Sequence, residues 1–166
     1  MRKSKLEFIC EQGFPATDAD DRLYWALMLQ PRIIGGVVAL GIVLQSPRLF
    51  LALSAVLWWS TLVPTRSIFD AIYNYAVASP RNLPPLGVAP APRRFAQGMA
   101  GAVALAISGA LLLGATITAW LLEGVFVVAV LRAVIGNSCF GAYAYHVLRR
   151  VFTKSQSLPP RAEAGC

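Results

Sequence analysis

Charged residues are scarce in this sequence of 166 residues: Asp, Glu, Lys and Arg make up 14% of the chain, whereas hydrophobic residues make up 57%. Soluble domains carry roughly a quarter charged residues and at most about half apolar ones. A water-soluble fold has no place for this much apolar surface. The composition therefore predicts an integral membrane protein whose first partner is the lipid bilayer.

Paired cysteines and catalytic motifs are also lacking. Cys10, Cys139 and Cys166 are scattered without the spacing of a disulfide scaffold, and the N-terminal residues lack the apolar stretch of a cleaved signal peptide. The sequence contains no Walker loop and no HExxH, GxSxG or CxxC motif. We therefore predict no catalytic residues, no metal site and no cofactor, and we favour a protein that is not an enzyme.

Basic residues exceed acidic ones by 15 to 8, which gives a net charge of +7. In a soluble protein this excess could indicate nucleic-acid binding. Here the basic residues gather at the ends of apolar segments, so the membrane surface explains them and no nucleic-acid partner is predicted.

Four apolar segments predict an all-α membrane protein with four transmembrane helices arranged as two hairpins. The segments are residues 33–44, 49–63, 96–113 and 117–135. The first two are short, because about 15 helical residues cover about 22 Å of a hydrocarbon layer of roughly 30 Å. Either this first hairpin spans the bilayer with its flanking arginines snorkelling, or it is re-entrant. We prefer spanning, because a re-entrant hairpin would leave Arg48 inside the bilayer.

A polar stretch and a Pro-rich connector divide the rest of the chain. Residues 67–79 place Ile68, Phe69 and Ile72 on one helical face with Asp70 opposite, which predicts a short amphipathic helix in the membrane surface. The predicted parts are a cytosolic tail with an interfacial helix (1–30), a membrane domain (31–150) and a disordered tail (151–166). Within the membrane domain, 31–66 is the first hairpin, 67–94 the interfacial helix and connector, and 95–150 the second hairpin with its cytosolic exit. Pro31 is expected to begin a new helix after a short one at 23–29.

The positions of the basic residues predict the orientation. With four spans, both termini and the middle connector share one side, and that side holds nearly all of the lysines and arginines. The opposite side has Arg48 alone, while Arg132 lies within a span. By the positive-inside rule we expect both termini in the cytoplasm and the protein in a bacterial cytoplasmic (inner) membrane.

Small residues recur every four positions in the third segment: Gly98, Ala102, Ala106, Ala110 and Gly114. Such a ribbon lets two helix backbones approach closely, and close packing is the main attraction between helices in lipid. The general richness of membrane helices in Ala and Gly is the alternative explanation. The pattern fits packing within the chain and packing between copies equally.

A few polar residues in apolar surroundings are candidates for a specific role. Glu123 and Arg132 are nine positions apart on opposite helical faces, so they cannot pair. We expect Glu123 to reach water near the outer turn, and Arg132, which lies deeper, either to snorkel or to need a partner or a cavity. Cys139, Tyr143 and His146 share one helical face, but two possible ligands are too few for a metal or haem site.

The second half resembles the bacterial membrane family catalogued as domain of unknown function 4395. The resemblance covers about residues 31–148 and rests on two short motifs. A P-x-R-F-A-Q-like entry is carried by Pro92, Arg94, Phe95, Ala96 and Gln97, and a C-x-G-C-like exit by Cys139 and Gly141. The resemblance implies two hairpins and no known activity. Ala142 stands where the second cysteine of the exit motif is expected, so a dithiol function cannot operate with Cys139 alone.

Three functions stay open at this point. The first is a non-enzymatic accessory or scaffold subunit that packs on itself, as a homo-oligomer, or on a larger membrane complex. The second is a carrier or channel for a small solute or ion, which acts as an oligomer with Arg132 facing a pore. The third is a thiol- or sulfur-handling membrane protein that uses Cys139. The scarcity of polar residues in the membrane segments favours the first.

Overall fold

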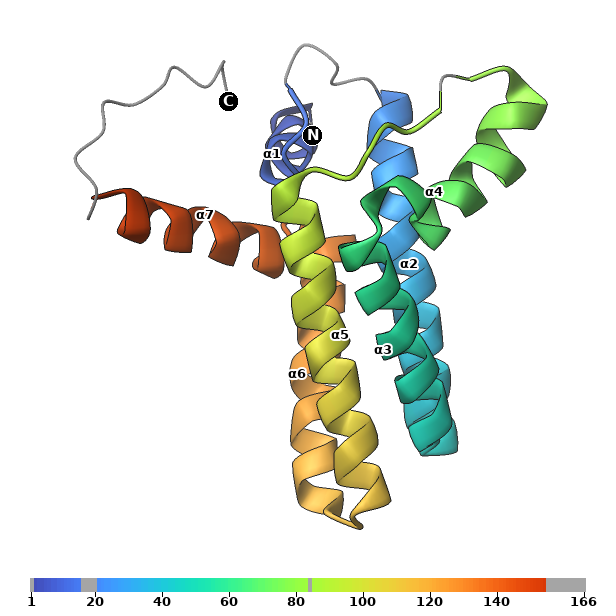
Figure 1. Ribbon diagram of the computed structural model, residues 1–166, viewed down its shortest axis with the longest axis vertical. Helices are drawn as coiled ribbons and strands as arrows, with labels where there is room; N and C mark the ends of the chain where they lie inside the picture. The colour runs from blue at the N-terminus through green and yellow to red at the C-terminus, as the bar shows by residue number, and fades with distance from the viewer. Residues whose placement is uncertain (1, 16–20, 84, 155–166) are drawn as a thin grey trace.

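Four long helices form the body of the protein in the computed structural model, which describes residues 2–15, 21–83 and 85–154. They are α2 (Asp21–Leu44), α3 (Pro47–Leu62), α5 (Ala91–Leu112) and α6 (Thr116–Val134), and they run side by side with alternating direction (Figure 1). The shorter elements gather at one end of this bundle: α1 (Arg2–Glu11), η2 (Pro64–Arg66), α4 (Ile68–Tyr73), η3 (Asn74–Ala78), η4 (Ser79–Arg81) and α7 (Phe140–Lys154). The described residues contain no strand, so the all-helical class predicted from the sequence is confirmed.

Three of the four long helices, α2, α5 and α6, are long and apolar enough to cross a membrane. The 22 residues of α5 extend over about 33 Å, whereas the 16 residues of α3 extend over only about 24 Å. The structure thus gives three candidate spans and one shorter apolar helix where the sequence predicted four spans.

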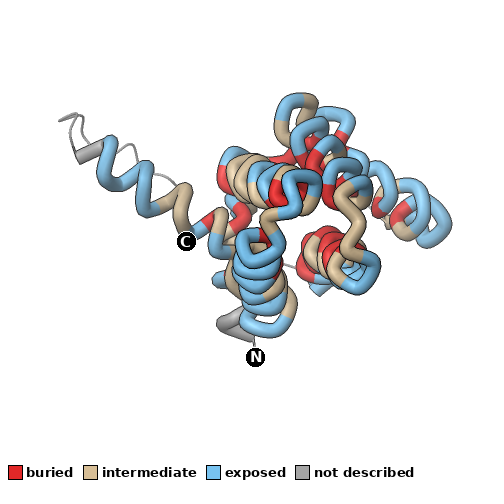
Figure 2. The backbone as a smooth tube through the Cα atoms, turned by 90° about the horizontal axis from the view of Figure 1, so that it is seen from below, coloured by how far each residue is buried: buried red, intermediate tan, exposed pale blue. Residues whose placement is uncertain are grey.

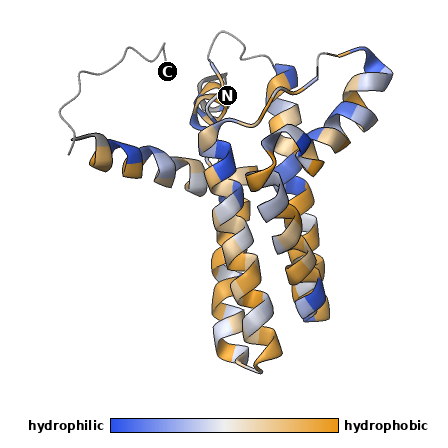
Figure 3. Ribbon diagram, in the orientation of Figure 1, coloured by the Kyte–Doolittle hydropathy of each residue, from blue (hydrophilic) through white to orange (hydrophobic). Residues whose placement is uncertain are grey.

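The outward faces of these helices are apolar and exposed. In the view along the bundle, buried residues face one another between the helices while the outer surfaces are exposed (Figure 2). Leu113, Ile117 and Leu121 are 85%, 80% and 67% exposed. Apolar colouring covers most of the bundle, and polar residues concentrate at the end that carries α1 and α4 (Figure 3). An apolar solvent around the bundle suits this surface, as expected for a membrane protein.

The core lies where the two hairpins meet. Phe50 and Leu57 of α3 pack against Ala104 and Ile107 of α5, and all four are almost fully buried. Two hydroxyl groups connect the same helices: Ser54 Oγ donates to the carbonyl of Gly101, and Ser108 Oγ to that of Pro47, each at 2.9 Å. Small residues at this contact allow the approach, since a Cβ added to Gly101 would lie 3.1 Å from the Trp58 ring.

The tip of the first hairpin does not reach as far as the tip of the second. Pro47, at the first tip, lies beside Ser108, which is four residues before the end of α5. Gln45, in the same tip, reaches Glu123, which is seven residues into α6. At 1.5 Å per residue, the second hairpin therefore extends about 6–10 Å further. Figure 1 shows the turn between α5 and α6 beyond the turn between α2 and α3.

Pro31 does not begin a helix, contrary to the expectation from the sequence. It lies inside α2, which continues from Asp21 to Leu44. A proline removes one backbone hydrogen bond within a helix, and neighbouring helices make that loss tolerable in membrane proteins. The predicted short helix at 23–29 is the first part of α2 instead.

The N-terminal segment contains a packed helix, α1, where the sequence suggested a cytosolic tail. In α1, Phe8 and Ile9 are 0% and 2% exposed, and they pack against Tyr24 and Met28 of α2. Two adjacent apolar residues in a polar segment give no helical periodicity, which explains why the sequence did not reveal the contact.

The C-terminal helix α7 runs across the axis of the bundle and is separate from α6 (Figure 1). Phe140, Tyr143, Val147 and Val151 are exposed on it, about one helical turn apart. The predicted disordered tail, 151–166, is therefore wrong for 151–154, which belong to α7. Residues 155–166 lie outside the described part of the chain.

Candidate functional site

A buried polar cluster lies at the end of the bundle where α2, α4 and α5 meet. Arg93, in the first turn of α5, donates from Nη2 to Asp70 Oδ1 at 2.7 Å. Its Nε and Nη2 also donate to Gln30 Oε1 at 3.1 and 2.9 Å. Gln97, one turn along α5, donates from Nε2 to the same oxygen at 3.1 Å. One amide oxygen of α2 thus accepts three hydrogen bonds from α5.

Local sequence places each member of the cluster. Pro92 fixes the first turn of α5, so that Arg93 and Gln97 follow on one helical face, four residues apart. Asp70 lies in the first turn of α4, directly after the short turn that returns from α3. The sequence placed Asp70 opposite the apolar face of a surface helix; in the structure it points inward and is 7% exposed.

Three atoms of this cluster have no hydrogen-bond partner within the described chain: Arg93 Nη1, Asp70 Oδ2 and Gln97 Oε1. Arg93 is 3% exposed and Gln97 is 2% exposed. A buried polar atom without a partner costs about 1–3 kcal/mol. The cluster therefore retains unused capacity, with one donor group on Arg93 and acceptor oxygens on Asp70 and Gln97.

A cavity of about 200 Å³ begins at this cluster and continues between α2, α5 and α6 to the start of α7. Its polar lining consists of Gln12, Gln30, Arg93, Gln97 and Cys139. The remaining walls are almost entirely apolar and include Ile34, Val103, Phe126, Ala129 and Val130. The cavity is thus amphipathic, with its polar groups at the end where the short elements gather.

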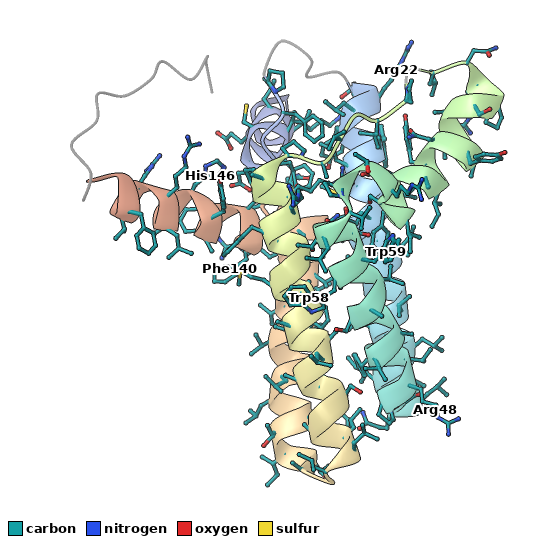
Figure 4. All side chains as sticks on the ribbon, in the orientation of Figure 1. Arg22, Arg48, Trp58, Trp59, Phe140 and His146 are labelled. Atoms are coloured by element: carbon teal, nitrogen blue, oxygen red, sulfur yellow. The ribbon has the colours of Figure 1, made fainter. Side chains whose placement is uncertain are left out.

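Glu11 of α1 binds the start of α7, next to Gln12 and Cys139 of the cavity lining. Its carboxylate accepts from the backbone N–H of Cys139 at 2.9 Å and from Ser138 Oγ at 3.3 Å. Its own carbonyl accepts from Nε2 of His146 at 3.2 Å, and Figure 4 shows His146 on the side of α7 that faces α1. A carboxylate at a helix N-terminus is stabilised by the helix dipole. Among the described residues, no group of three His, Cys, Asp or Glu side chains could hold a metal.

Cys139 lines the cavity, and its thiol contacts the side chain of Gln12, which directly follows α1. Burial raises the pKa of this thiol, although backbone N–H groups of Ala142 and Gly141 and the Gln12 side chain act in the opposite direction. The thiol is therefore held in its protonated form more firmly than an exposed one. Ala142, at the place of the expected second cysteine, is fully buried.

The residues of the two short motifs come together around the start of α5. Ala96 contacts Gly141 so closely that a Cβ added to Gly141 would lie 2.6 Å from the Ala96 Cα. The Phe95 ring lies 5.8 Å from that of Tyr145 in α7. Arg94 Nε donates to the carbonyl of Thr61 in α3 at 3.1 Å.

Pro92 and Gln97 complete these contacts on the other sides of α5. Pro92 lies against Gly13, at the end of α1, and Gln97 binds Gln30 of α2. The motif therefore joins the first turns of α5 to α2, α3 and α7 and to the residues that follow α1.

A family model for a domain of unknown function, DUF4395, matches residues 29–150. The chain belongs to this family. The match covers most of the chain and includes both motifs, the polar cluster and the cavity lining, apart from Gln12 and Leu27. No curated protein and no solved structure matches the chain. The family therefore supplies a shared sequence pattern without an activity.

Glu123 and Arg132 lie elsewhere than the sequence suggested. Glu123 does not reach water: it is 1% exposed, because the tip of the first hairpin covers it and Gln45 Nε2 lies 3.3 and 3.4 Å from its two oxygens. Arg132 is exposed in the last turn of α6, outside the cavity lining. A cation there is favoured by the C-terminal end of the helix dipole.

The small-residue ribbon divides between several environments. A Cβ added to Gly98 would lie 3.5 Å from Thr61, Ala110 is buried, and Gly114 closes the second hairpin turn with φ +69°. Ala102 and Ala106, in the middle of the ribbon, are exposed. Packing of α5 within the chain uses Gly101, Ala104 and Ser108 on another face instead.

Sequence reasoning missed Arg93, Asp70, Gln30 and Glu11 as members of this site. Arg93 was assigned to the positively charged side, and Asp70 to the polar face of a surface helix. One signal was available: an arginine and a glutamine four residues apart on an apolar helix require polar partners. The nearby acidic residue in the preceding short helix could have been proposed as that partner.

Proposed function

We propose that this chain is a four-span protein of a bacterial inner membrane, with both termini in the cytoplasm, that acts without catalysis as an accessory or scaffold subunit. Two features support the topology. Basic residues concentrate at the end with α1 and α4, where Figure 4 shows Arg22, while Arg48 lies at the opposite tip. The amphipathic helix α7 projects sideways from the bundle, in the half that carries Arg22 (Figure 4), as a helix in the membrane surface would.

The short first hairpin can still cross under this proposal, because its tip lies only about 6–10 Å short of the second tip. The one charged residue of that tip, Arg48, is exposed and able to snorkel. Cysteine labelling tests the crossing. In intact cells, Arg48→Cys should react with a membrane-impermeant maleimide from outside, and Arg81→Cys only after permeabilisation. Labelling of Arg48→Cys from the cytoplasmic side alone would show a re-entrant hairpin.

The scaffold function is carried by one observation: packing within the chain leaves the centre of the small-residue ribbon uncovered. Ala102 and Ala106 are exposed, and a Cβ added to Gly109 would meet nothing within 4 Å. At 100° per residue these three positions fall within about 60° on one face of α5. In lipid, a face of small residues gains most by packing closely on another such face, so the first expected occupant is a second copy of this chain.

Substitution of this face tests the proposal. The full chain, extracted in mild detergent, should be an oligomer, and Ala102→Ile with Ala106→Ile should reduce it to a monomer. Val128→Ile, at a position of α6 that is 65% exposed, is the matched control and should keep the oligomer. A wild-type monomer that co-elutes with no other membrane protein would refute the scaffold function. Release of a different protein by the same two substitutions would identify a larger complex.

The carrier and thiol functions receive less support. Arg132 does not line the cavity, so the pore that required it lacks its central residue. Cys139 does line the cavity, but burial raises the pKa of its thiol, which lowers the fraction of reactive thiolate. A solute flux into vesicles that depends on Arg132 would favour the carrier function. A phenotype of Cys139→Ser would favour the thiol function.

A further inference from the structure

The amphipathic cavity combines an apolar interior with buried polar atoms that have unused hydrogen-bonding capacity. The walls contributed by α2, α5 and α6 exclude charged groups, apart from Arg93 at the polar end. There, the Nη1 of Arg93 can donate and the Oε1 of Gln97 can accept, and neither has a partner in the described chain. Buried polar groups of native proteins are almost always satisfied, so two such atoms at one cavity point to an occupant.

The charges of the cluster determine what kind of head group fits. The Arg93 guanidinium is already paired with Asp70 at 2.7 Å, and both side chains are less than 10% exposed. An anionic head beside this neutral pair would leave an uncompensated charge in a medium of low polarity, which is strongly unfavourable. The head is therefore neutral. To satisfy both free atoms it must accept from the guanidinium and donate to the amide oxygen, as a hydroxyl group does.

The size and the position of the cavity define the rest of the ligand. A cavity of 150 Å³ lined by apolar residues holds benzene, so about 200 Å³ accommodates one six-membered ring with a short substituent. The lining residues Val125 and Phe140 are 63% and 53% exposed. Phe140 lies where α7 leaves the bundle (Figure 4), so the cavity borders the surface that faces lipid. A longer apolar tail can leave along this side into the bilayer.

We infer that this cavity binds a neutral amphiphile with a hydroxylated ring, taken from the bilayer, whose hydroxyl group lies between Arg93 and Gln97. A lipid quinol and a small phenolic compound share this chemistry. Binding involves no covalent or redox step. The inference does not depend on the scaffold function, since the cavity and the exposed ribbon of α5 use different residues.

Three probes that differ only in the head group test this inference: 4-pentylphenol, pentylbenzene and 4-pentylbenzoate. The full chain in phosphatidylcholine nanodiscs should bind the phenol at least about 10-fold more tightly than pentylbenzene, which corresponds to one or two net hydrogen bonds. The benzoate should bind more weakly than the phenol, because its charge is not compensated. Equal affinities for phenol and pentylbenzene, tightest binding of the benzoate, or no binding of any probe would each overturn the inference.

Two variants locate the site. Gln97→Leu removes the acceptor at similar volume and leaves the Arg93 donor, so it should reduce the preference for the phenol over pentylbenzene and leave pentylbenzene affinity unchanged. Ala100→Phe fills the cavity and should abolish binding of both, whereas Thr118→Phe, at an exposed position of α6 outside both the cavity lining and the small-residue ribbon, is the matched control and should change neither. Unchanged phenol preference in Gln97→Leu, or retained binding in Ala100→Phe, would refute the site. If Gln97→Leu does not fold, the three probes and the two phenylalanine variants decide.

The source of the ligand can be identified separately. Organic extracts of the protein purified from native membranes, analysed by mass spectrometry, should contain a hydroxylated ring compound that the Ala100→Phe variant lacks and the Thr118→Phe variant retains. A long isoprenoid chain on that ring would indicate a lipid quinol, and its absence a small phenolic compound. Equal amounts of every ring compound in both variants would contradict binding in this cavity.

Discussion

The buried ion pair between Arg93 and Asp70 allows a quantitative test of the fold. Their side chains are 4% and 9% exposed, and Arg93 connects α4 to α2 and α5 through its guanidinium. Replacement of Asp70 by Ala leaves this cation buried without a counter-charge. Breaking a buried pair in this way costs about 3–5 kcal/mol of the free energy of unfolding. Only the two bonds to the Gln30 oxygen would then hold the guanidinium.

Removal of both charges should behave differently. In Asp70→Leu with Arg93→Met, apolar side chains of similar length fill the same space, so the double variant should recover most of the loss. The exposed pair of Lys5 and Asp21 serves as the control: its side chains are 28% and 74% exposed, and Lys5→Met should cost at most about 1 kcal/mol.

Equilibrium unfolding of the full chain in mixed micelles, with increasing fractions of a denaturing detergent, measures these differences. The expected order of stability is wild type and Lys5→Met together, then the double variant, then Asp70→Ala. Two results would show that the cluster does not hold the hairpins together. One is a free energy of unfolding of Asp70→Ala within about 1 kcal/mol of the wild-type value. The other is a double variant as unstable as Asp70→Ala.

Three further predictions concern other parts of the same fold. Gly141→Ala should lower stability by about 1–3 kcal/mol, because the added Cβ would lie 2.6 Å from the Ala96 backbone. Gly124→Ala is the control and should be neutral or stabilising, because its Cβ would meet nothing within 4 Å. Thermal unfolding of both variants in one detergent measures the difference. Gln45→Leu should cost about 1–3 kcal/mol in the same unfolding assay, because it removes the polar partner of buried Glu123, and a neutral result would show that the contact contributes nothing. In the folded protein, the rate of Cys139 alkylation, followed by peptide mass spectrometry, should show a pH midpoint above the ordinary pKa of a thiol, because burial raises the pKa of Cys139. A midpoint at or below the ordinary pKa would contradict the buried environment.

The segments that form long helices could be predicted because a membrane helix is determined by local composition. Runs of apolar residues have no alternative in lipid but to satisfy their backbone groups within a helix. The two hairpin turns could be predicted for the same reason, because Gln45–Arg48 and Gly114–Thr116 interrupt the apolar runs. The element at Pro31 was missed because a proline signals a helix start in water but is tolerated within helices that pack on neighbours.

The polar cluster could not be predicted because it depends on contacts between segments. Arg93 and Arg94 are adjacent and chemically identical, yet a rotation of 100° along α5 buries the first against Asp70 and directs the second to the Thr61 carbonyl. Nothing in the local sequence distinguishes them. Glu11 presents the same difficulty, since its role as a cap of α7 joins residues 128 positions apart.

The placement of polar contacts explains how a cavity persists in a bundle that could otherwise close. The Arg93 cluster joins α2, α4 and α5 at one end, and the contact of Gln45 with Glu123 joins the first hairpin to α6 near the other. Hydrogen bonds of this kind are directional, so they fix the separation and register of the helices more closely than apolar packing does. Between the two levels, α2 and α6 are in close contact: a Cβ at Gly35 would lie 3.0 Å from Val130, which lines the cavity. Collapse of the cavity would require α2 or α6 to move inward, and such a movement would break polar contacts at both ends. Loss of Gln45 should therefore affect ligand affinity as well as stability, although Gln45 lies outside the cavity.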